Sequence, residues 1–104
     1  MTAASGKLYA KKVYMSSDAK LKTDVKDAPA DIQLPDIKEF TWIDSSVKSY
    51  GVIAQDVEAA GLTELVSDDG DKKTVDYAAL LCLMAKQLQE KVARLEAKID
   101  QLER

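Results

Sequence analysis

A short polar stretch holds the side chains best suited to chemistry. Ser17 and Asp18 are followed closely by Lys20 and Lys22. A serine hydroxyl becomes a nucleophile when a base removes its proton, and a neutral lysine amine does this in serine–lysine pairs. A lysine amine is neutral only where burial or nearby positive charge favours loss of its proton. The spacing alone is a weak signal, because Ser-Asp followed by lysines is also typical of solvated turns.

The composition narrows the chemistry further. The chain has 104 residues, a net charge of −3, no histidine and a single cysteine, Cys82. Without histidine, Ser-His-Asp and Cys-His systems and the commonest zinc ligand are excluded. The acidic run at residues 68–71 lacks the ligand spacing of an EF-hand. We therefore expect no metal, no cofactor and no small-molecule substrate.

Charge and hydropathy also bear on partners. The 15 basic and 18 acidic residues are mixed along the chain, which predicts no basic face for nucleic acid. No apolar run reaches the roughly 18 residues of a membrane span. We expect neither nucleic acid nor membrane as a partner.

The elements that must position the polar stretch are short. Alternating aromatic and β-branched residues predict a strand at 7–15, and Pro29 and Pro35 predict irregular structure at 25–38. The remaining patterns predict a hairpin of 39–44 with 47–53, a helix over 54–60 ending at Gly61, and a hairpin with an acidic turn at 68–71.

Individual residues in these elements carry further predictions. Phe40 and Trp42 are expected in the core, and Cys82 is expected to be a small buried side chain. Gly51 predicts either a bulge or a close approach of backbone. Gln55 is a candidate for a hydrogen bond that supports the Ser–Lys pair, although a structural role is favoured.

The C-terminal quarter predicts one long helix. Residues 76–104 contain no Pro or Gly, and Asp76 is a suitable N-cap. Such a helix is about 43 Å long, whereas a compact domain of this size has a radius of gyration of about 13 Å. We expect the helix to project and to need a partner; the alternative is an amphipathic helix packed on its own domain.

The apolar residues of this helix repeat every seven positions, as in a coiled coil. The a and d positions, predicted as the subunit interface, are Leu81, Ala85, Leu88, Val92, Leu95, Ile99 and Leu102. Lys91 and Lys98 at g face Glu96 and Glu103 at e in a parallel, in-register assembly. Val and Ile at a with Leu at d favour two strands. Ala85 and the extra apolar residues Leu80, Leu83 and Met84 widen the seam at its base, which is compatible with three. The periodicity leaves dimer and trimer open.

The order of motifs resembles the peptidase S74 family, the intramolecular chaperone domains of phage tailspikes and tail fibres of the endosialidase type. The matching stretches, within residues 14–104, are 17–25, 40–42, 50–58, 64–66 and 75–77, followed by the coiled coil. Lys20 stands where the family usually has arginine, and the segment between Val25 and Phe40 is short.

The resemblance implies an α+β fold with a β-hairpin-containing domain, short helices and a long C-terminal helix in a parallel trimeric coiled coil. Residues 1–17 would be the upstream, fibre-linked segment, 18–75 the chaperone domain and 76–104 the coiled coil. Partners would be two further copies of the chain and an upstream β-rich fibre segment. The site of action would be the host cytoplasm during phage assembly, and the released fragment would be absent from the mature virion.

The resemblance also implies self-cleavage, as a single-turnover serine peptidase. Ser17 would be the nucleophile and Lys22 the general base. Lys20, by its nearby charge, and Gln55, by its polar side chain, are the candidate supporting residues that the sequence itself offers. The implied scissile bond is Ser17–Asp18. Attack by the Ser17 hydroxyl on its own carbonyl forms a strained four-membered ring, whereas attack on the preceding carbonyl forms a five-membered ring, so the chemistry leaves the bond open. The alternatives are a non-cleaving trimerisation module and a generic coiled-coil adaptor.

Overall fold

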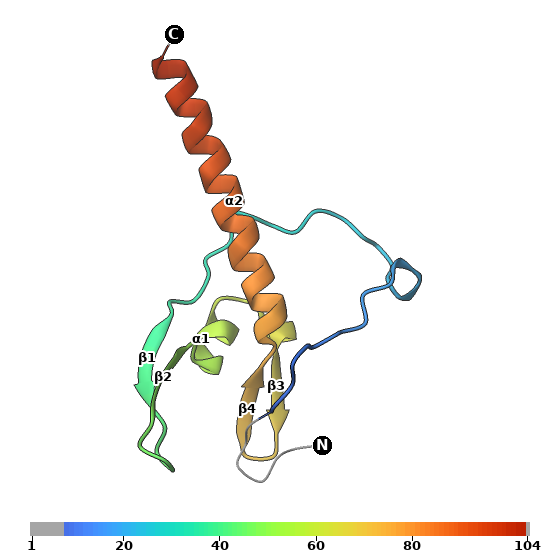
Figure 1. The fold of residues 1–104 in the computed structure, drawn as a ribbon, viewed down its shortest axis with the longest axis vertical. Coiled ribbons are helices and arrows are strands. Elements are labelled where there is room, and N and C mark those ends of the chain that lie inside the picture. The colour runs from blue at the N-terminus through green and yellow to red at the C-terminus, as the bar shows by residue number, and fades with distance from the viewer. Residues whose placement is uncertain (1–7, 104) are drawn as a thin grey trace.

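Two small antiparallel hairpins and a short helix lie at the foot of one long helix (Figure 1). The computed structural model describes residues 8–103. The elements are η1 (Ala19–Leu21), β1 (Lys38–Thr41), β2 (Lys48–Gly51), α1 (Ala54–Ala59), η2 (Thr63–Leu65), β3 (Val66–Asp69), β4 (Lys72–Val75) and α2 (Tyr77–Leu102). The α+β prediction is confirmed, and so is the irregular structure of the proline-containing segment.

The first hairpin pairs β1 with β2, with Phe40 opposite Ser49. Its connecting loop closes through two hydrogen bonds, from the N–H of Trp42 to the carbonyl of Val47 and from the N–H of Ser46 to the carbonyl of Trp42. Ser46 adopts a left-handed φ of 58° there. Phe40 is half-buried, but Trp42 is 54% exposed, so its predicted place in the core is wrong. Trp42 follows the last paired residue of β1, with the centre of its ring 5.1 Å from that of Phe40, and lines an open pocket rather than the core.

Helix α1 ends as the sequence predicts. Gly61 has a φ of 86°, and its N–H donates to the carbonyl of Glu58 while the N–H of Leu62 donates to that of Val57. This double hydrogen bond is the Schellman motif, which favours a residue without a Cβ at the left-handed position. It also brings Leu62 back onto Val57, and both side chains are buried in the core.

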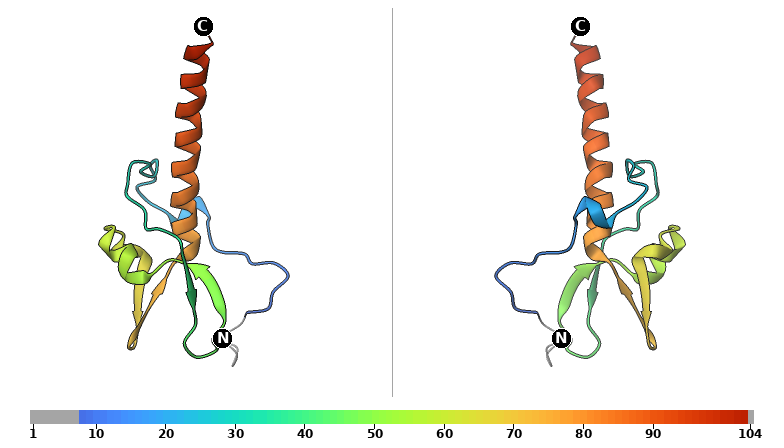
Figure 2. Two further views of the ribbon diagram at one scale, coloured as in Figure 1. Left: turned by 90° about the vertical axis from the view of Figure 1, so that its left-hand side faces the viewer. Right: turned by 90° about the vertical axis from the view of Figure 1, so that its right-hand side faces the viewer.

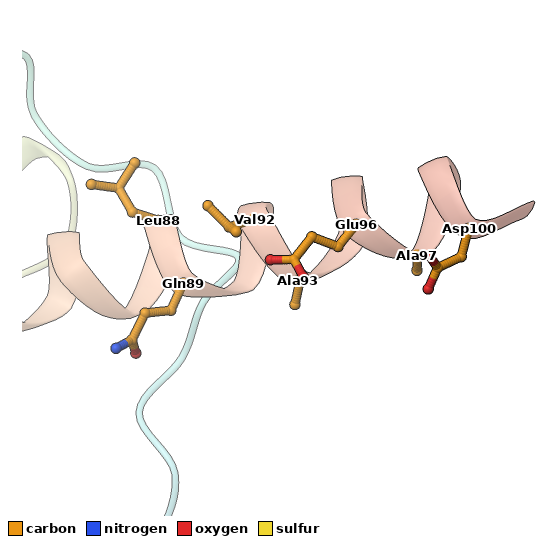
Figure 3. Close-up of a pocket in the computed structure, with 7 residues that line it drawn as sticks. All are labelled: Leu88, Gln89, Val92, Ala93, Glu96, Ala97 and Asp100. Atoms are coloured by element: carbon orange, nitrogen blue, oxygen red, sulfur yellow. The ribbon is translucent and has the colours of Figure 1, made fainter. Parts of the chain in front are cut away.

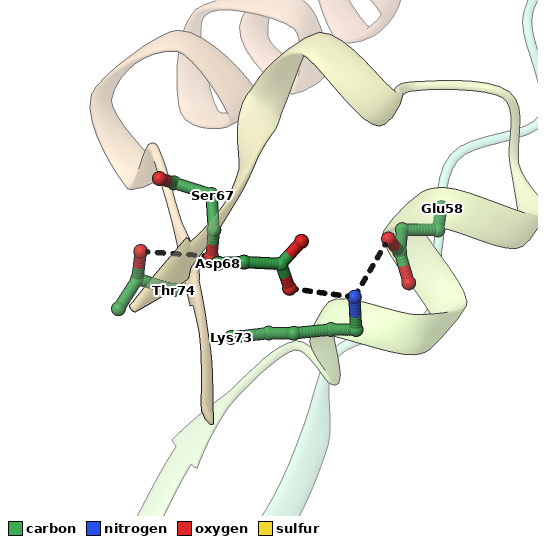
Figure 4. A network of polar contacts seen from close by, with 5 residues as sticks. All are labelled: Glu58, Ser67, Asp68, Lys73 and Thr74. Carbon is green, nitrogen blue, oxygen red and sulfur yellow. Dashed lines mark hydrogen bonds and ion pairs between the residues drawn. The ribbon is translucent and has the colours of Figure 1, made fainter. Parts of the chain in front are cut away.

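The second hairpin, β3–β4, is joined to α1 by one lysine. Gly70 has the left-handed φ of 71° that a two-residue turn requires, which confirms the predicted hairpin. Lys73 Nζ lies 2.8 Å from Asp68 and 3.2 Å from Glu58 of α1 (Figure 4). Hydrogen bonds to Asp68 and then to Glu58 raise the pKa of Lys73 above 10.5. Because the folded-state pKa of Lys73 is raised, the stabilisation from its ammonium form is lost as the pH rises above 10.5 and through the raised pKa.

The buried core is small and sits where the first turns of α2 meet the hairpins and α1. Only Val52, Val57, Leu62 and Leu80 are buried among the described apolar residues. Leu80 is 1% exposed, and Leu83 and Met84 pack against this core half-buried. The prediction that Leu80 and Leu83 widen the coiled-coil seam is therefore wrong: they fasten α2 to its own domain. Ala85, the other residue predicted to widen the seam, is exposed at an a position, and the choice between two and three strands stays a prediction.

Beyond these first turns, α2 projects from the rest of the chain (Figure 2). Asp76 caps its N-terminus by accepting a hydrogen bond from the N–H of Ala79, as predicted. The 26 residues span about 39 Å at 1.5 Å each. The radius of gyration is 17.8 Å, well above the roughly 13 Å of a compact domain. Projection of the helix is confirmed.

The strand predicted at 7–15 is wrong for residues 8–15, which are irregular; Lys7 lies outside the described residues. The large apolar side chains of this segment are 67–85% exposed: Leu8, Tyr9, Val13, Tyr14 and Met15. Strand propensity expresses how well a residue fits a half-buried sheet surface. Within residues 8–103 both hairpins are two-stranded, so residues 8–15 pair with neither of them.

Tyr77, the first residue of α2, holds the end of β2. Its hydroxyl accepts a hydrogen bond from the N–H of Val52 at 3.1 Å. A Cβ on Gly51 would collide with that hydroxyl and would lie 3.3 Å from the ring carbon that carries it. The predicted close approach at Gly51 is confirmed, and its partner is the tyrosine ring.

We expect Gly51→Ala to lower the stability of the fold by about 1–3 kcal/mol, the usual cost of overpacking. The measurement is thermal unfolding at one chain concentration, since association shifts the midpoint. Ser49→Ala on the same strand is the control and should change the midpoint little. In a Tyr77→Phe background the added methyl group meets no hydroxyl, so Gly51→Ala should cost less there. Equal costs in both backgrounds would contradict the assigned contact.

Candidate functional site

A single tight turn brings Ser17 and Lys22 together. The Asp18 carboxylate accepts a hydrogen bond from the N–H of Lys20 at 2.9 Å, which caps the short helix η1. The N–H groups of Leu21 and Lys22 donate back to the carbonyls of Asp18 and Ala19. Because η1 reverses the chain within one turn, Lys22 Nζ comes within 2.8 Å of Ser17 Oγ and donates a hydrogen bond to it.

The chemistry open to this pair depends on its surroundings. Both Ser17 and Lys22 are exposed in the single chain. As the donor, the ammonium form of a lysine orients a serine hydroxyl but cannot take its proton. A lysine serves as a base where burial or further positive charge favours its neutral form, and the single chain supplies no burial at this turn. The single chain therefore has the geometry of a serine–lysine pair without the desolvation that would activate it.

The two predicted supporting residues, Lys20 and Gln55, lie at different distances from the Ser17–Lys22 pair. Lys20 is two residues from Lys22 within the same turn, and its side chain makes no hydrogen bond or ion pair with residues 8–103. Gln55 lies in α1, which Figure 1 shows on the other side of α2 from η1. One chain thus places Lys20 near the pair but does not bring Gln55 to it.

The predicted coiled-coil seam is open along the whole of α2. The large side chains at its a and d positions are 52–85% exposed: Leu81, Leu88, Val92, Leu95, Ile99 and Leu102. Ala85 is exposed as well. Figure 3 shows Leu88 and Val92 along the helix beside Ala93, Glu96 and Ala97, which together line a shallow groove. An apolar stripe of this length on a small protein marks an interaction surface.

The chain covers a different flank of α2 with its own residues 30–34. The Gln87 side-chain amide donates to the carbonyls of Ile32 at 2.7 Å and Ala30 at 3.3 Å. Seven residues further along the helix, Arg94 lies 3.4 Å from Asp31. Gln87 and Arg94 occupy c positions, so the segment lies beside the seam and leaves the a and d residues free. Sequence-based prediction missed this docking, for which Gln87 and Arg94 seven residues apart were the only signal.

Cys82 is also exposed, so its predicted burial is wrong for the single chain. It follows Leu81 at an e position, on the flank away from residues 30–34. The core forms around Leu80, on another side of the helix, and leaves this thiol uncovered.

The described residues were also compared with the requirements of a metal site and of a membrane-spanning helix. Residues 8–103 contain no group of three or more histidine, cysteine or carboxylate side chains placed to hold a metal ion. None of the helices described there combines the length and apolar character needed to cross a membrane.

A known protein family matches the part of the chain that holds the Ser17–Lys22 turn and the first hairpin. Residues 17–67 match the family model Peptidase_S74, described as the chaperone of endosialidase. The match begins at Ser17, includes Lys22, β1, β2 and α1, and ends in β3. No curated protein and no solved structure matches the chain.

Proposed function

Because residues 17–67 belong to the Peptidase_S74 family, the chaperone of endosialidase, we propose that this chain is an intramolecular chaperone that cuts itself free. It assembles as a parallel homotrimer through α2, holds three copies of an upstream β-rich fibre segment in register, and then cleaves next to Ser17. The observation that carries the proposal is the 2.8 Å contact between Lys22 Nζ and Ser17 Oγ at the start of the matched segment.

The proposed cleavage uses Lys22 as the base. In its neutral form the amine accepts the proton of the attacking oxygen, that oxygen adds to the backbone carbonyl, and the amide nitrogen leaves carrying a proton. At the Ser17–Asp18 bond, attack by the Ser17 hydroxyl on its own carbonyl closes a four-membered ring. The attacking oxygen there therefore comes from water, or from Ser17 of a neighbouring copy, in which case water then hydrolyses the ester that forms between the two copies. In both cases Asp18 becomes the new N-terminus.

Assembly would switch this chemistry on. The pair is exposed in the single chain, so Lys22 is solvated there. A neighbouring copy that covers η1 would remove that water and favour the neutral amine. Cleavage would then report that assembly is complete.

The seam on α2 would supply the chaperone step. Parallel helices gather identical chains at one end and raise the effective concentration of the attached segments. This lowers the entropic barrier to starting a β-structured trimer, whose non-local pairings otherwise form slowly. After release of residues 18–104 the fibre would persist because its unfolding is slow. We place these events in the host cytoplasm during phage assembly.

Sedimentation equilibrium together with mass spectrometry of the purified chain tests the proposal. We expect three copies per particle and a fragment that begins at Asp18. A fragment that begins at Ser17 would move the cut to the preceding bond, where the five-membered ring is available. An intact chain in a three-copy particle would leave only a trimerisation module, and a monomer that binds an unrelated protein would make it an adaptor.

A further inference from the structure

The two flanks of the α2 seam differ in a way that the heptad pattern does not reveal. Positions e and b lie on one flank, and positions g and c lie on the other. Residues 30–34 cover part of the c side through Gln87 and Arg94. The e side carries Cys82 and the groove of Figure 3, and both are exposed in the described chain.

The g flank holds an apolar pocket at the foot of the helix. Its walls come from α2, from the end of β2 and from the residue before β1: Tyr77, Leu81, Met84, Tyr50 and Ile37. Leu81 belongs both to this pocket and to the d positions of the seam. The pocket is thus an extension of the seam onto the β1–β2 hairpin. Ile37 is 64% exposed and Tyr50 65% exposed, so the single chain does not fill it.

The charges of α2 determine what faces the pocket in a parallel assembly. Pairing of Lys91 with Glu96, and of Lys98 with Glu103, places each g residue opposite the e residue five positions later in the neighbouring copy. The same rule applied two heptads earlier than Lys91 places Tyr77 opposite Cys82. Both are exposed in the single chain, and Cys82 is the e residue at this level.

We propose that the pocket of each copy receives the first turns of the neighbouring α2, with Cys82 of the neighbouring copy against Tyr77 and Leu81. This rests on the parallel assembly proposed above and adds the β1–β2 hairpin to its interface. Each copy offers a pocket on one flank and a thiol on the other, so the contact runs head to tail and closes into a ring. Through Tyr77 and Val52 the same contact fixes the hairpin relative to the seam.

Thiol labelling of the full chain tests this contact. A maleimide added to the assembled wild-type chain should modify Cys82 at least about tenfold more slowly than it does a freely exposed thiol. The reference is Gln101→Cys in a Cys82→Ala background, because residue 101 is at an outward-facing c position of the same helix. Sedimentation of both samples shows whether the chains are assembled during labelling.

A matched pair of substitutions tests the pocket itself. Ile37→Asp adds a charge to the pocket wall, whereas Ile43→Asp adds the same charge at a residue that is 100% exposed in the hairpin turn. We expect Ile37→Asp to weaken association by about tenfold or more and to speed the labelling of Cys82. Ile43→Asp should leave both unchanged.

The outcomes separate this inference from the function that it rests on. Two results would overturn the pocket contact and leave the assembly standing. One is a three-copy particle in which Cys82 reacts as fast as the thiol of the Gln101→Cys reference, and the other is equal behaviour of Ile37→Asp and Ile43→Asp. A wild-type chain that sediments as a monomer would overturn both the contact and the assembly.

Discussion

Replacing Ser17 with alanine should abolish self-cleavage while the chain still assembles. If the cut depends on the Ser17 hydroxyl, its removal lowers the cleavage rate by roughly 10³-fold or more, as loss of a catalytic group commonly does. Lys22→Met should have an equal effect, because it keeps the approximate length of the side chain and removes the amine that lies 2.8 Å from the hydroxyl. The measurement is the fraction of cut chain over time, followed by mass spectrometry at a fixed chain concentration.

Neighbouring residues supply the controls for this experiment. Ser16→Ala removes the adjacent hydroxyl, which makes no described contact with Lys22, and cleavage should continue. Lys20→Met removes the second lysine of the turn but not its backbone hydrogen bond to Asp18, so a moderate slowing is expected if Lys20 only supplies charge. Equal loss of cleavage in Lys20→Met and Lys22→Met would argue against Lys22 as the single base. Continued cleavage in Ser17→Ala would refute the assignment of Ser17 as the nucleophile.

The second large effect is expected from substitutions in the coiled-coil seam of α2. Substitution of both Leu88 and Leu95 by lysine should convert the assembly into monomers and stop cleavage at the same time. Each leucine is more than half exposed in the single chain, and burying that exposed part against a neighbour would stabilise an assembly by about 1–2 kcal/mol. Because the variant removes two such side chains from every copy and sets like charges against each other, association should weaken by roughly 10³-fold or more.

The same charge placed elsewhere on α2 is the control. Ala97→Lys with Gln101→Lys adds two lysines at outward-facing f and c positions, and this variant should remain assembled and should cleave. Sedimentation gives the mass, and the fraction of cut chain gives the activity. Efficient cleavage by monomers of the Leu88 and Leu95 variant would show that the pair works without a neighbour and would refute activation by assembly.

Much of the local structure could be predicted from the sequence because its causes are local. A glycine at 61 ends α1, Gly70 permits the two-residue turn, and Asp76 caps α2. The contact between Ser17 and Lys22 is equally local, since five residues and one turn of η1 suffice to form it. The seven-residue repeat on α2 likewise follows from the helical period alone.

The wrong predictions concern residues whose environment depends on what lies opposite them in space. Residues 8–15 have strand-like composition, but within residues 8–103 neither hairpin has a third strand. Leu80 and Leu88 look alike in sequence, yet Leu80 is buried in the domain core and Leu88 is exposed. Burial depends on packing between distant segments, and a pattern along the chain does not specify those partners.

Composition and periodicity excluded histidine-dependent chemistry and predicted a helix that projects from its domain. The sequence has no histidine, and a glycine-free, proline-free helix of this length had to extend past so small a domain. The roles of Ser17 and Lys22 came from the resemblance to the peptidase S74 family, because their spacing alone is a weak signal. Which faces of that helix are already occupied depended instead on tertiary packing. Residues 30–34 reach Gln87 and Arg94, and Tyr77 meets Gly51, through contacts between segments about 25 to 63 residues apart. These contacts involve other parts of α2. The a and d side chains of the seam and the pocket at its foot therefore stay exposed in the single chain.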